Sequence, residues 1–362
     1  MRGRAMILER YIGEADDGRV LRDYIKREFD ISARLLRRIK TRYSITINGA
    51  VAFTNVIVKG GDRLQIDLGA VTRALESVIP EDVPIDVIYE DEYIIAINKQ
   101  AGRIVHPSAY DGGGTIANGL ARYYERTGRA SGIHPISRLD RDTTGVILFA
   151  KNAYTANAFN EQLRGGGFCK EYLGVSQKAP EPEAGVIDIP LGRVDGYIML
   201  RAARCDGKPA KTYYETLLNA RGMCLILMRP VTGRTHQLRA HMSSIGCALV
   251  SDGLYGPEVP NAVSSSKPHA VSSHKPRAVS SPKPRAVSTG NPRPDDAGDI
   301  TMAAAPLNAA SVCGRQALHS WRLTFHHPYA NRYMTLTAPL PDDFRSLIDL
   351  MLRYKVLGAG RT

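Results

Sequence analysis

The chain has 362 residues, of which 43% are hydrophobic and 23% charged, so it is long enough for two globular domains. Its net charge of +12 favours a polyanionic partner, with nucleic acid ahead of a membrane surface. The longest apolar runs, 146–150 and 223–228, fall far below the ~20 residues that span a bilayer. Charges interrupt the N-terminal stretch where a secretory signal needs an apolar run. Five cysteines without a Cys-x-x-Cys pair favour reduced thiols, so we expect a cytoplasmic protein without disulfides or a zinc site.

The first segment, residues 1–70, combines a basic helix with short strands. In ISARLLRRIKTRY, Ser32 can cap a helix whose apolar residues recur at helical spacing. The opposite face is basic throughout and carries Arg34, Arg37, Arg38, Lys40 and Arg42. Strands are predicted in ITING and GGDRLQIDL, with a tight turn at Asn48-Gly49. A merely solvated helix face usually mixes both signs of charge, so we interpret this face as a contact for an RNA backbone.

The main domain follows a linker at residues 71–84 and occupies 85–256 and 301–348. Strands are predicted in VIYEDEYIIAINK and at 146–150, 172–176, 212–217 and 223–229. Helices are predicted at 116–127, 153–163 and 235–245. Many strands with few, irregularly placed helices predict an α+β fold, a mixed and mostly antiparallel sheet with flanking helices. The last residues, 349–362, are expected to be a tail.

Residues 257–300 differ from the rest of the chain. They contain four tandem eight-residue units, AVSSSKPH, AVSSHKPR, AVSSPKPR and AVSTGNPR. Only valine offers a sizeable apolar side chain there, so we expect a disordered, low-complexity insert. The units hold six Lys or Arg residues and no acid, which is half of the net charge. The case for RNA must therefore rest on local patches of the folded part.

A first candidate for chemistry is SRLDRDTTGVILFAKN. Because alternate side chains of an extended segment share a face, Arg138 and Asp140 point one way while Leu139 points to the core. An aspartate beside a guanidinium stays ionised and oriented, as a carboxylate nucleophile must be. On this pattern alone, a surface ion pair is the competing interpretation.

A second candidate is PVTGRTHQLRAHMSSIG, in which Thr235 can cap a helix that ends at Gly246. The expected buried stripe consists of Leu238, Met242 and Ile245. Arg234 and Arg239 lie off that stripe and can face a groove. His236 and His241 are about 140° apart on a helix and form no His-Glu-x-x-His pattern, so no metal is expected.

A third candidate, KEYLGV, begins a strand with Tyr172. This tyrosine can stack on a base or hydrogen-bond a carboxylate, and a half-buried strand tyrosine is equally compatible with the pattern.

Together these motifs resemble the RluA family of pseudouridine synthases. The resemblance rests on SRLDRDTTGVILFAKN, KEYLGV, RPVTGRTHQLRAHMSSIGCALVSDGLYG and LHSWRLTFHHPYANRYMTLTAPLPDDF, in this order. The upstream YEDEYIIAINKQAGRIVHP matches the opening strand of that family. The similarity spans 85–344 and is interrupted by the insert, while residues 1–70 resemble an S4-like RNA-binding module.

The resemblance implies a role for individual residues. Asp140 matches the catalytic aspartate, Tyr172 the tyrosine that stacks on the target base, and Arg239 the basic residue paired with the aspartate. Arg138 matches the arginine that replaces the flipped nucleotide, and Arg234 and His236 are expected to shape the pocket or touch phosphate. Isomerising uridine needs no redox change, so no metal or organic cofactor is expected.

Two positions depart from the family pattern. Ser137 replaces the histidine before Arg-Leu-Asp, and Ser251 replaces the glycine before Asp252. Two alternatives stay open: a weakened or inactive RNA-binding ribosome-assembly factor, and a glycosidase, which would need a second carboxylate beside Asp140. The expected partner is RNA, and ribosomal RNA of the large subunit before transfer RNA. We expect a monomer that binds neither DNA nor a membrane.

The basic helix gives a first prediction. Replacing Arg37 and Arg38 by glutamine should weaken RNA affinity and make its salt dependence shallower, because each phosphate contact adds to the slope of log K against log salt. Filter binding between about 50 and 200 mM salt measures both quantities. A slope unchanged from that of the parent protein would exclude this helix as the RNA contact.

Overall fold

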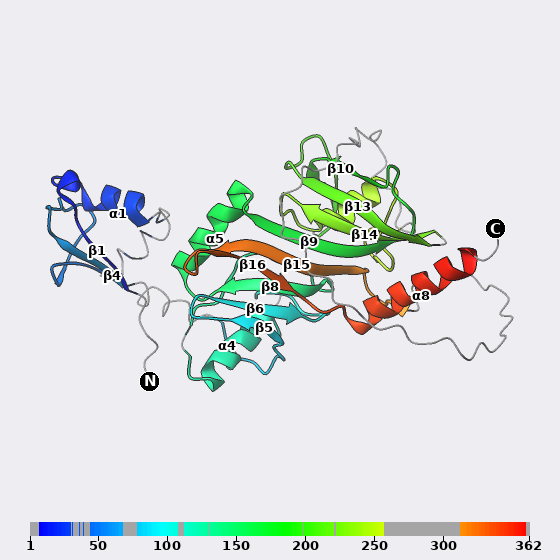
Figure 1. Ribbon diagram of the computed structural model, residues 1–362, viewed down its shortest axis with the longest axis horizontal. Coiled ribbons are helices and arrows are strands. Elements are labelled where there is room, and N and C mark those ends of the chain that lie inside the picture. The colour runs from blue at the N-terminus through cyan, green and yellow to red at the C-terminus, as the bar shows by residue number, and fades with distance from the viewer. Residues whose placement is uncertain are drawn as a thin grey trace.

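The computed structural model describes residues 7–29, 31, 36, 39, 44–67, 78–107, 112–129, 131–197, 199–220, 222–256 and 312–359. Within these residues the strands form a four-stranded sheet near the N-terminus, a ten-stranded central sheet and a two-stranded hairpin. Figure 1 shows the small N-terminal sheet at one end of the long axis and the last helix at the other.

The N-terminal unit has its own sheet and its own core. Its strand order is β1-β4-β2-β3, with all pairs antiparallel. The elements are β1 (Ile7–Tyr11), η1 (Glu14–Asp16), α1 (Leu21–Phe29), β2 (Ile45–Ile47), β3 (Ala50–Val51) and β4 (Arg63–Asp67). Asn48 and Gly49, both with positive φ, form the expected tight turn between β2 and β3. Leu36 and Ile39 are buried in this core, whereas the five basic residues predicted to contact RNA lie outside the described residues.

The central sheet carries the rest of the described chain. Its path runs β10-β13-β14-β9-β15-β8-β6-β5, with β16 paired to β15 and β7 to β8. The bounds are β5 (Val87–Glu90), β6 (Ile94–Lys99), β7 (His134–Pro135), β8 (Thr144–Ala150), β9 (Phe168–Ser176), β10 (Ala184–Asp188), β13 (Lys211–Ala220), β14 (Met223–Pro230), β15 (Leu318–His327) and β16 (Arg332–Thr337). Only β15 and β8 pair in parallel, so the mostly antiparallel α+β fold predicted from the sequence is confirmed.

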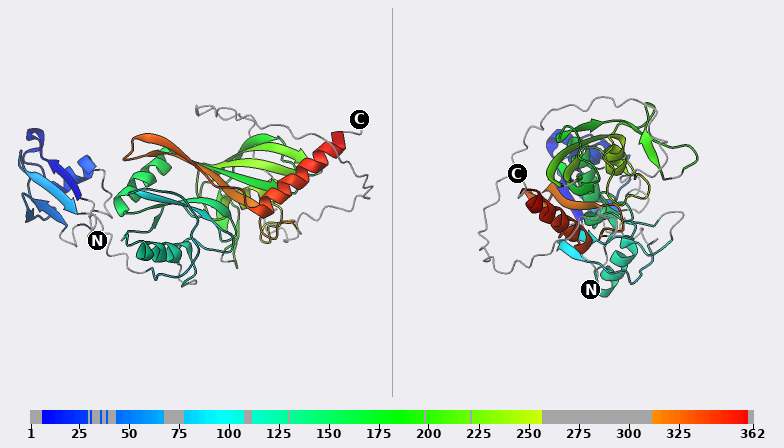
Figure 2. Two further views of the ribbon diagram at one scale, coloured as in Figure 1. Left: turned by 60° about the horizontal axis from the view of Figure 1, so that its bottom comes forward. Right: turned by 90° about the vertical axis from the view of Figure 1, so that its right-hand side faces the viewer.

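Helices cover both faces of this sheet. On one face, α4 (Ile116–Arg126) and α6 (Gln237–Ser244) pack with Ile95 and Ile97 of β6. On the other face, α5 (Ala153–Gly165) packs near Ile94, and α8 (Asp342–Ala359) packs against β9 and β14. Figure 2 shows α8 running along one end of the sheet. Because neighbouring residues of β6 face opposite layers and both layers are covered, the strand is apolar almost throughout.

Most predicted elements of the central domain lie where the sequence placed them. The helix predicted at 116–127 is α4, and Thr115 caps it through its side chain. The last helix, α8, extends through residue 349, where a tail was expected, and its Met351 is fully buried. None of the described helices has the length and apolar character needed to cross a membrane. The insert at 257–300 lies outside the described residues.

Gly145 marks the point where β15 joins β8. Its φ is 109°, and a Cβ built there would lie 2.1 Å from the carbonyl oxygen of Ser320. Since this neighbour is backbone at the heart of the sheet, it cannot move away without breaking the pairing of the two strands.

Replacing Gly145 by alanine should therefore destabilise the protein by at least about 3 kcal/mol, because strain and a backbone clash act together. Gly165→Ala is the matched control, since a Cβ at Gly165 meets nothing within 4 Å. Urea unfolding of both variants measures the difference. Equal stability of the two variants would contradict this account of the junction.

Candidate active site

The loop that carries Asp140 connects β7 with β8. Leu139 is buried and anchors the loop, Arg138 is exposed, and the Asp140 side chain is 25% exposed. The alternation expected from the sequence is therefore present at these three positions. A carboxylate on such a loop can meet solvent or a substrate while its backbone stays fixed.

The buried Lys99 and the largely buried Arg315 hold the main chain of this loop. The Lys99 ammonium donates to the carbonyl oxygens of Gln100 and Arg141 at 2.8 and 2.7 Å. Arg315 donates to the carbonyl oxygen of Asp142 at 2.9 Å and is held by Asp343 at 2.8 Å. Burial lowers the pKa of Lys99 to about 7, against the negative charge of Asp142, which raises it. These bonds to main-chain carbonyls stabilise one loop conformation.

Arg239 lies in α6, and its guanidinium faces the loop that carries Asp140. Its guanidinium forms a two-fold pair with Asp252, with Nε–Oδ2 and Nη2–Oδ1 distances of 2.7 Å each. The Arg239 side chain is 6% exposed and that of Asp252 is fully buried. Burial lowers the pKa of Arg239, but the hydrogen bonds and charge of Asp252 outweigh it and raise the pKa above its ordinary value. Arg239 is therefore a fixed cation with a defined orientation.

The third nitrogen of Arg239 reaches Asp140. Nη1 lies 3.5 Å from Asp140 Oδ2, a looser contact than the pair with Asp252. Asp140 thus lies beside a cation without being enclosed by it, and its oxygens keep acceptor capacity. Arg239 was expected from the sequence to face a groove; it is instead buried, and only this one edge of it meets the loop.

Asp252 is the part of the site that sequence reasoning missed. Besides Arg239 it accepts the backbone N–H groups of Leu254 and Tyr255 at 3.0 and 3.1 Å. It is a second carboxylate near Asp140, which the glycosidase alternative requires. Because Asp252 is fully buried and its oxygens are taken, it cannot flank a scissile bond as that chemistry demands. The one indication in the sequence was the residue just before it, Ser251, which stands where the family pattern has a glycine.

Ser251 has a left-handed backbone, with φ of 57°. Glycine adopts this conformation without cost, which explains in physical terms why a glycine suits this position. The Ser251 hydroxyl is also buried without a hydrogen-bond partner in the described part of the chain. The turn that aims Asp252 at Arg239 is therefore strained here.

Tyr172 lies in β9 at the centre of the sheet, between β14 and β15. It is 7% exposed and belongs to the cluster that includes Leu139. Burial raises the pKa of the phenol; the hydrogen bond of Ser320 lowers it, and the charge of Asp140 raises it further. The phenol therefore stays protonated at neutral pH, close enough to Asp140 to sense its charge.

The histidines of α6 are interior hydrogen-bonding groups. The helix begins at Gln237 after His236, whose φ is 54°, so Thr235 is not the N-cap that the sequence suggested. His236 is buried and its Nδ1 lies 3.1 Å from the Tyr255 hydroxyl, which removes it from the surface where an RNA contact was expected. His241 contacts Thr212 and the carbonyl of Ile189 instead. The two rings have different partners and do not converge.

The remaining predicted contacts lie at the rim of the site. Arg138 and Arg234 are exposed and line one pocket together with the hairpin of β11 (Leu191–Arg193) and β12 (Arg201–Ala203). Arg234 is tied down by its Nε, which donates to the carbonyl of Pro209 at 2.9 Å. The sequence gave no reason to expect the hairpin there.

Comparison with known proteins identifies the class. Residues 93–244 match the family described as RNA pseudouridylate synthase. The chain is 31% identical over 322 residues to YjbO of Bacillus subtilis, described as an uncharacterized RNA pseudouridine synthase, covering 89% of this chain and 95% of that one. It is also 31% identical over 296 residues to ribosomal large subunit pseudouridine synthase D of Escherichia coli, covering 81% and 78%. The chain therefore belongs to the RNA pseudouridine synthases, in the RluA family that its motifs indicated.

A solved structure has the same fold. Human RNA pseudouridylate synthase domain containing 4 superimposes with a TM-score of 0.50 over 78% of this chain and 95% of that one, at 22% identity. At this identity the likeness concerns the fold, which agrees with the mixed sheet described above.

The strained turn gives a prediction about stability. Ser251→Gly should be more stable than Ser251→Ala by about 1 kcal/mol, because both remove the unpaired hydroxyl but only glycine removes the left-handed strain. Thermal unfolding of the two variants measures this difference. If the alanine variant were as stable as the glycine variant, strain at this position would be excluded.

Proposed function

We propose that Asp140 is the catalytic nucleophile and that the enzyme converts specific uridines of large-subunit ribosomal RNA to pseudouridine. The observation that carries the proposal is the chain of contacts from Asp252 through Arg239 to Asp140. Of the two carboxylates in this chain of contacts, Asp140 is the one that a substrate can reach, because 25% of its side chain is exposed.

The target base must leave its stack to reach Asp140. Extrusion costs a few kcal/mol, least for a loop or a mismatched pair. Tyr172 supports binding of the extruded uracil in this proposal, because its strand is fixed between two others and its phenol is neutral. In this proposal Arg138, which is exposed on the same loop, fills the space that the base leaves.

The reaction is an isomerisation, so every atom of uridine is retained. The N1–C1′ bond breaks, the uracil turns, C5 bonds to C1′, and the proton of C5 is lost while N1 gains one. Asp140 acts either by adding to the sugar or by removing a proton from the ribose or base. In both routes the buried Arg239 stabilises the negative charge of Asp140 in surroundings drier than water, where a fixed cation counts for more.

The choice of ribosomal RNA rests on two observations. A relative that is 31% identical over most of this chain is named a ribosomal large subunit pseudouridine synthase. The N-terminal unit has its own sheet and core, and its sequence resembles an S4-like module, which supports a second RNA contact there. A protein with two RNA-binding parts suits a large structured RNA.

Replacing Asp140 by asparagine tests the nucleophile. We expect pseudouridine formation to fall by several orders of magnitude, because the amide can neither add to the sugar nor accept a proton, while folding and RNA affinity change little. The measurement is pseudouridine content of large-subunit ribosomal RNA transcripts after single-turnover incubation, with transfer RNA transcripts and free uridine in parallel.

Asp142→Asn is the matched control, two residues along the same loop. In the described residues its carboxylate accepts the backbone N–H of Gly102 at 3.2 Å and faces the charge of Lys99, but it does not pair with Arg239, so its loss should lower activity far less than the loss of the Asp140 charge. Substantial product from the Asp140 variant would remove Asp140 from its role. If the parent protein modified only transfer RNA, the proposed ribosomal substrate would be contradicted, but the role of Asp140 would not.

A further inference from the structure

A basic pocket of about 590 Å³ lies at the rim of the candidate active site. It is formed by the β11–β12 hairpin and its flanking turns, with Arg138 from the loop of Asp140 and 233–235 from the turn before α6. Six cationic side chains line it: Arg138, Arg193, Arg201, Arg204, Lys208 and Arg234. Only two acids, Asp195 and Asp206, lie among them.

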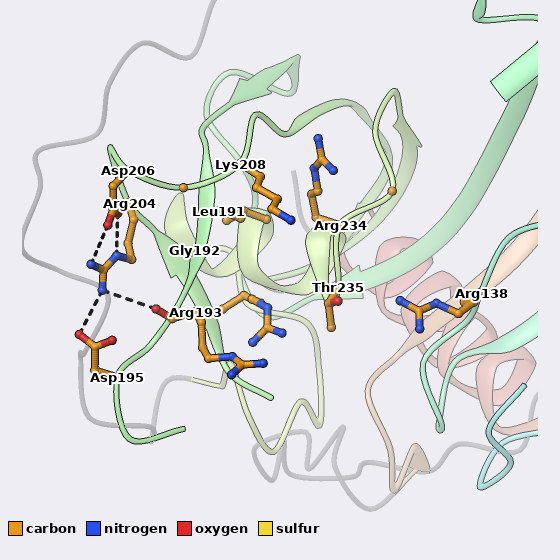
Figure 3. Close-up of a pocket in the computed structure, with 13 residues that line it drawn as sticks. Arg138, Leu191, Gly192, Arg193, Asp195, Arg204, Asp206, Lys208, Arg234 and Thr235 are labelled. Atoms are coloured by element: carbon orange, nitrogen blue, oxygen red, sulfur yellow. Dashed lines mark hydrogen bonds and ion pairs between the residues drawn. The ribbon is translucent and has the colours of Figure 1, made fainter. Parts of the chain in front are cut away.

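Both acids are used by a single arginine. Arg204 Nε and Nη2 lie 2.8 and 3.0 Å from Asp206, and Nη1 lies 3.4 Å from Asp195. Figure 3 shows Arg204 turned to these two carboxylates, away from the arm of Arg138 that extends toward the hairpin. In the part of the chain that the structure describes, no carboxylate pairs with Arg138, Arg193 or Lys208. The pocket therefore keeps an excess of positive charge.

The register of the hairpin opposes two of these charges. Arg193 pairs with Arg201 directly across β11 and β12. Like charges at opposite positions of an antiparallel pair destabilise it. An anion beside Arg193 and Arg201 can meet both guanidinium groups, because they leave facing positions of neighbouring strands.

The hairpin is a rigid frame for these side chains. Leu191 and Lys208 exchange two backbone hydrogen bonds of 3.0 and 2.9 Å. Gly207 packs so closely that a Cβ there would lie 2.6 Å from the carbonyl carbon of Leu191. Side chains that leave a fixed backbone lose less freedom when they bind a ligand than side chains on a mobile loop.

One tyrosine connects this frame with the catalytic ion pair. The Tyr255 hydroxyl accepts the backbone N–H of Arg201 at 2.9 Å, and the Arg239 guanidinium lies 5.0 Å from the centre of the Tyr255 ring. Burial lowers the pKa of His236, so its neutral Nδ1 can accept the proton of the same hydroxyl at 3.1 Å. The position of the hairpin is thus tied to the position of Arg239.

We propose that this pocket is a seat for phosphodiester groups of the RNA strand beside the target nucleotide. The inference rests on the proposed function and adds where the strand runs: over the β11–β12 hairpin, from Arg138 toward Arg193 and Lys208. Arg138 is two residues from Asp140, at most about 7 Å along the chain, so a phosphate held here lies close to the extruded nucleotide. Because the contacts are made to phosphate, they position the strand without reading its sequence.

The test removes the two unpaired charges of the hairpin. The double variant Arg193→Gln and Lys208→Gln is compared with Arg164→Gln and Arg345→Gln, which removes two exposed charges from α5 and α8 on the other face of the sheet. Affinity for a large-subunit ribosomal RNA fragment is measured against salt, together with kcat/KM for pseudouridine formation.

We expect the hairpin variant to bind roughly 10- to 30-fold more weakly at 0.1 M salt, with a salt slope shallower by about 1.4, as for two lost contacts to a single strand. Its kcat/KM should fall by the same factor, while the control variant keeps the affinity and activity of the parent. A charge-preserving variant, Arg193→Lys with Lys208→Arg, should restore binding, which separates lost charge from a damaged hairpin.

Equal affinity and slope in the hairpin and control variants would overturn the pocket as a phosphate seat. So would a charge-preserving variant that binds as weakly as the glutamine variant. Failure of the proposed function has a different signature: the parent protein would form no pseudouridine in any RNA tested, whatever the hairpin variants do to binding.

Discussion

The buried two-fold pair between Arg239 and Asp252 is the constraint on which the site depends. Burying either ion alone would cost several kcal/mol, and the cost is offset only because the geometry is tight on both sides. With two of its nitrogens committed to Asp252, Arg239 has one orientation, and in that orientation its third nitrogen faces Asp140. The cation beside the Asp140 loop is thus held in place by a carboxylate that is itself fully buried. The turn that holds this carboxylate contains Ser251, whose left-handed backbone is strained.

The loop that carries Asp140 is restrained through its main chain. Lys99 is the last residue of β6, and Arg315 lies just before β15. Both donate to main-chain carbonyls of the loop. The loop can therefore carry an exposed carboxylate without moving, because its backbone is fixed by buried cations and its Leu139 by the core. Asp140 and Arg239 are 99 residues apart in the chain. The 3.5 Å distance between Arg239 Nη1 and Asp140 Oδ2 therefore depends on both restraints, one on the arginine and one on the loop.

Local patterns predicted the elements well and their ends less well. Apolar runs located β6, β8 and β14 because strands covered on both faces contain little else. Thr235 was misjudged as a cap because Gln237, held by Thr232, satisfies the backbone N–H of Arg234 instead. Asp252 could not be found from spacing, since its importance comes from a contact between turn and helix. The β11–β12 hairpin was missed because its short strands carry arginines where an alternating apolar pattern was sought.

Net charge was the weakest guide, because what matters is which charges are paired. Several cations of the interior are matched by carboxylates: Lys151 by Glu90, Arg239 by Asp252 and Arg315 by Asp343. Such paired cations count toward the number of basic residues in the chain, but they make no contact with a polyanion. The pocket beside the hairpin differs, since in the described residues no carboxylate pairs with Arg193 or Lys208 and the nearby acids pair with Arg204. Cations without a carboxylate partner are the ones that a polyanion can bind, so the proposed RNA path rests on local pairing and not on the overall charge of +12.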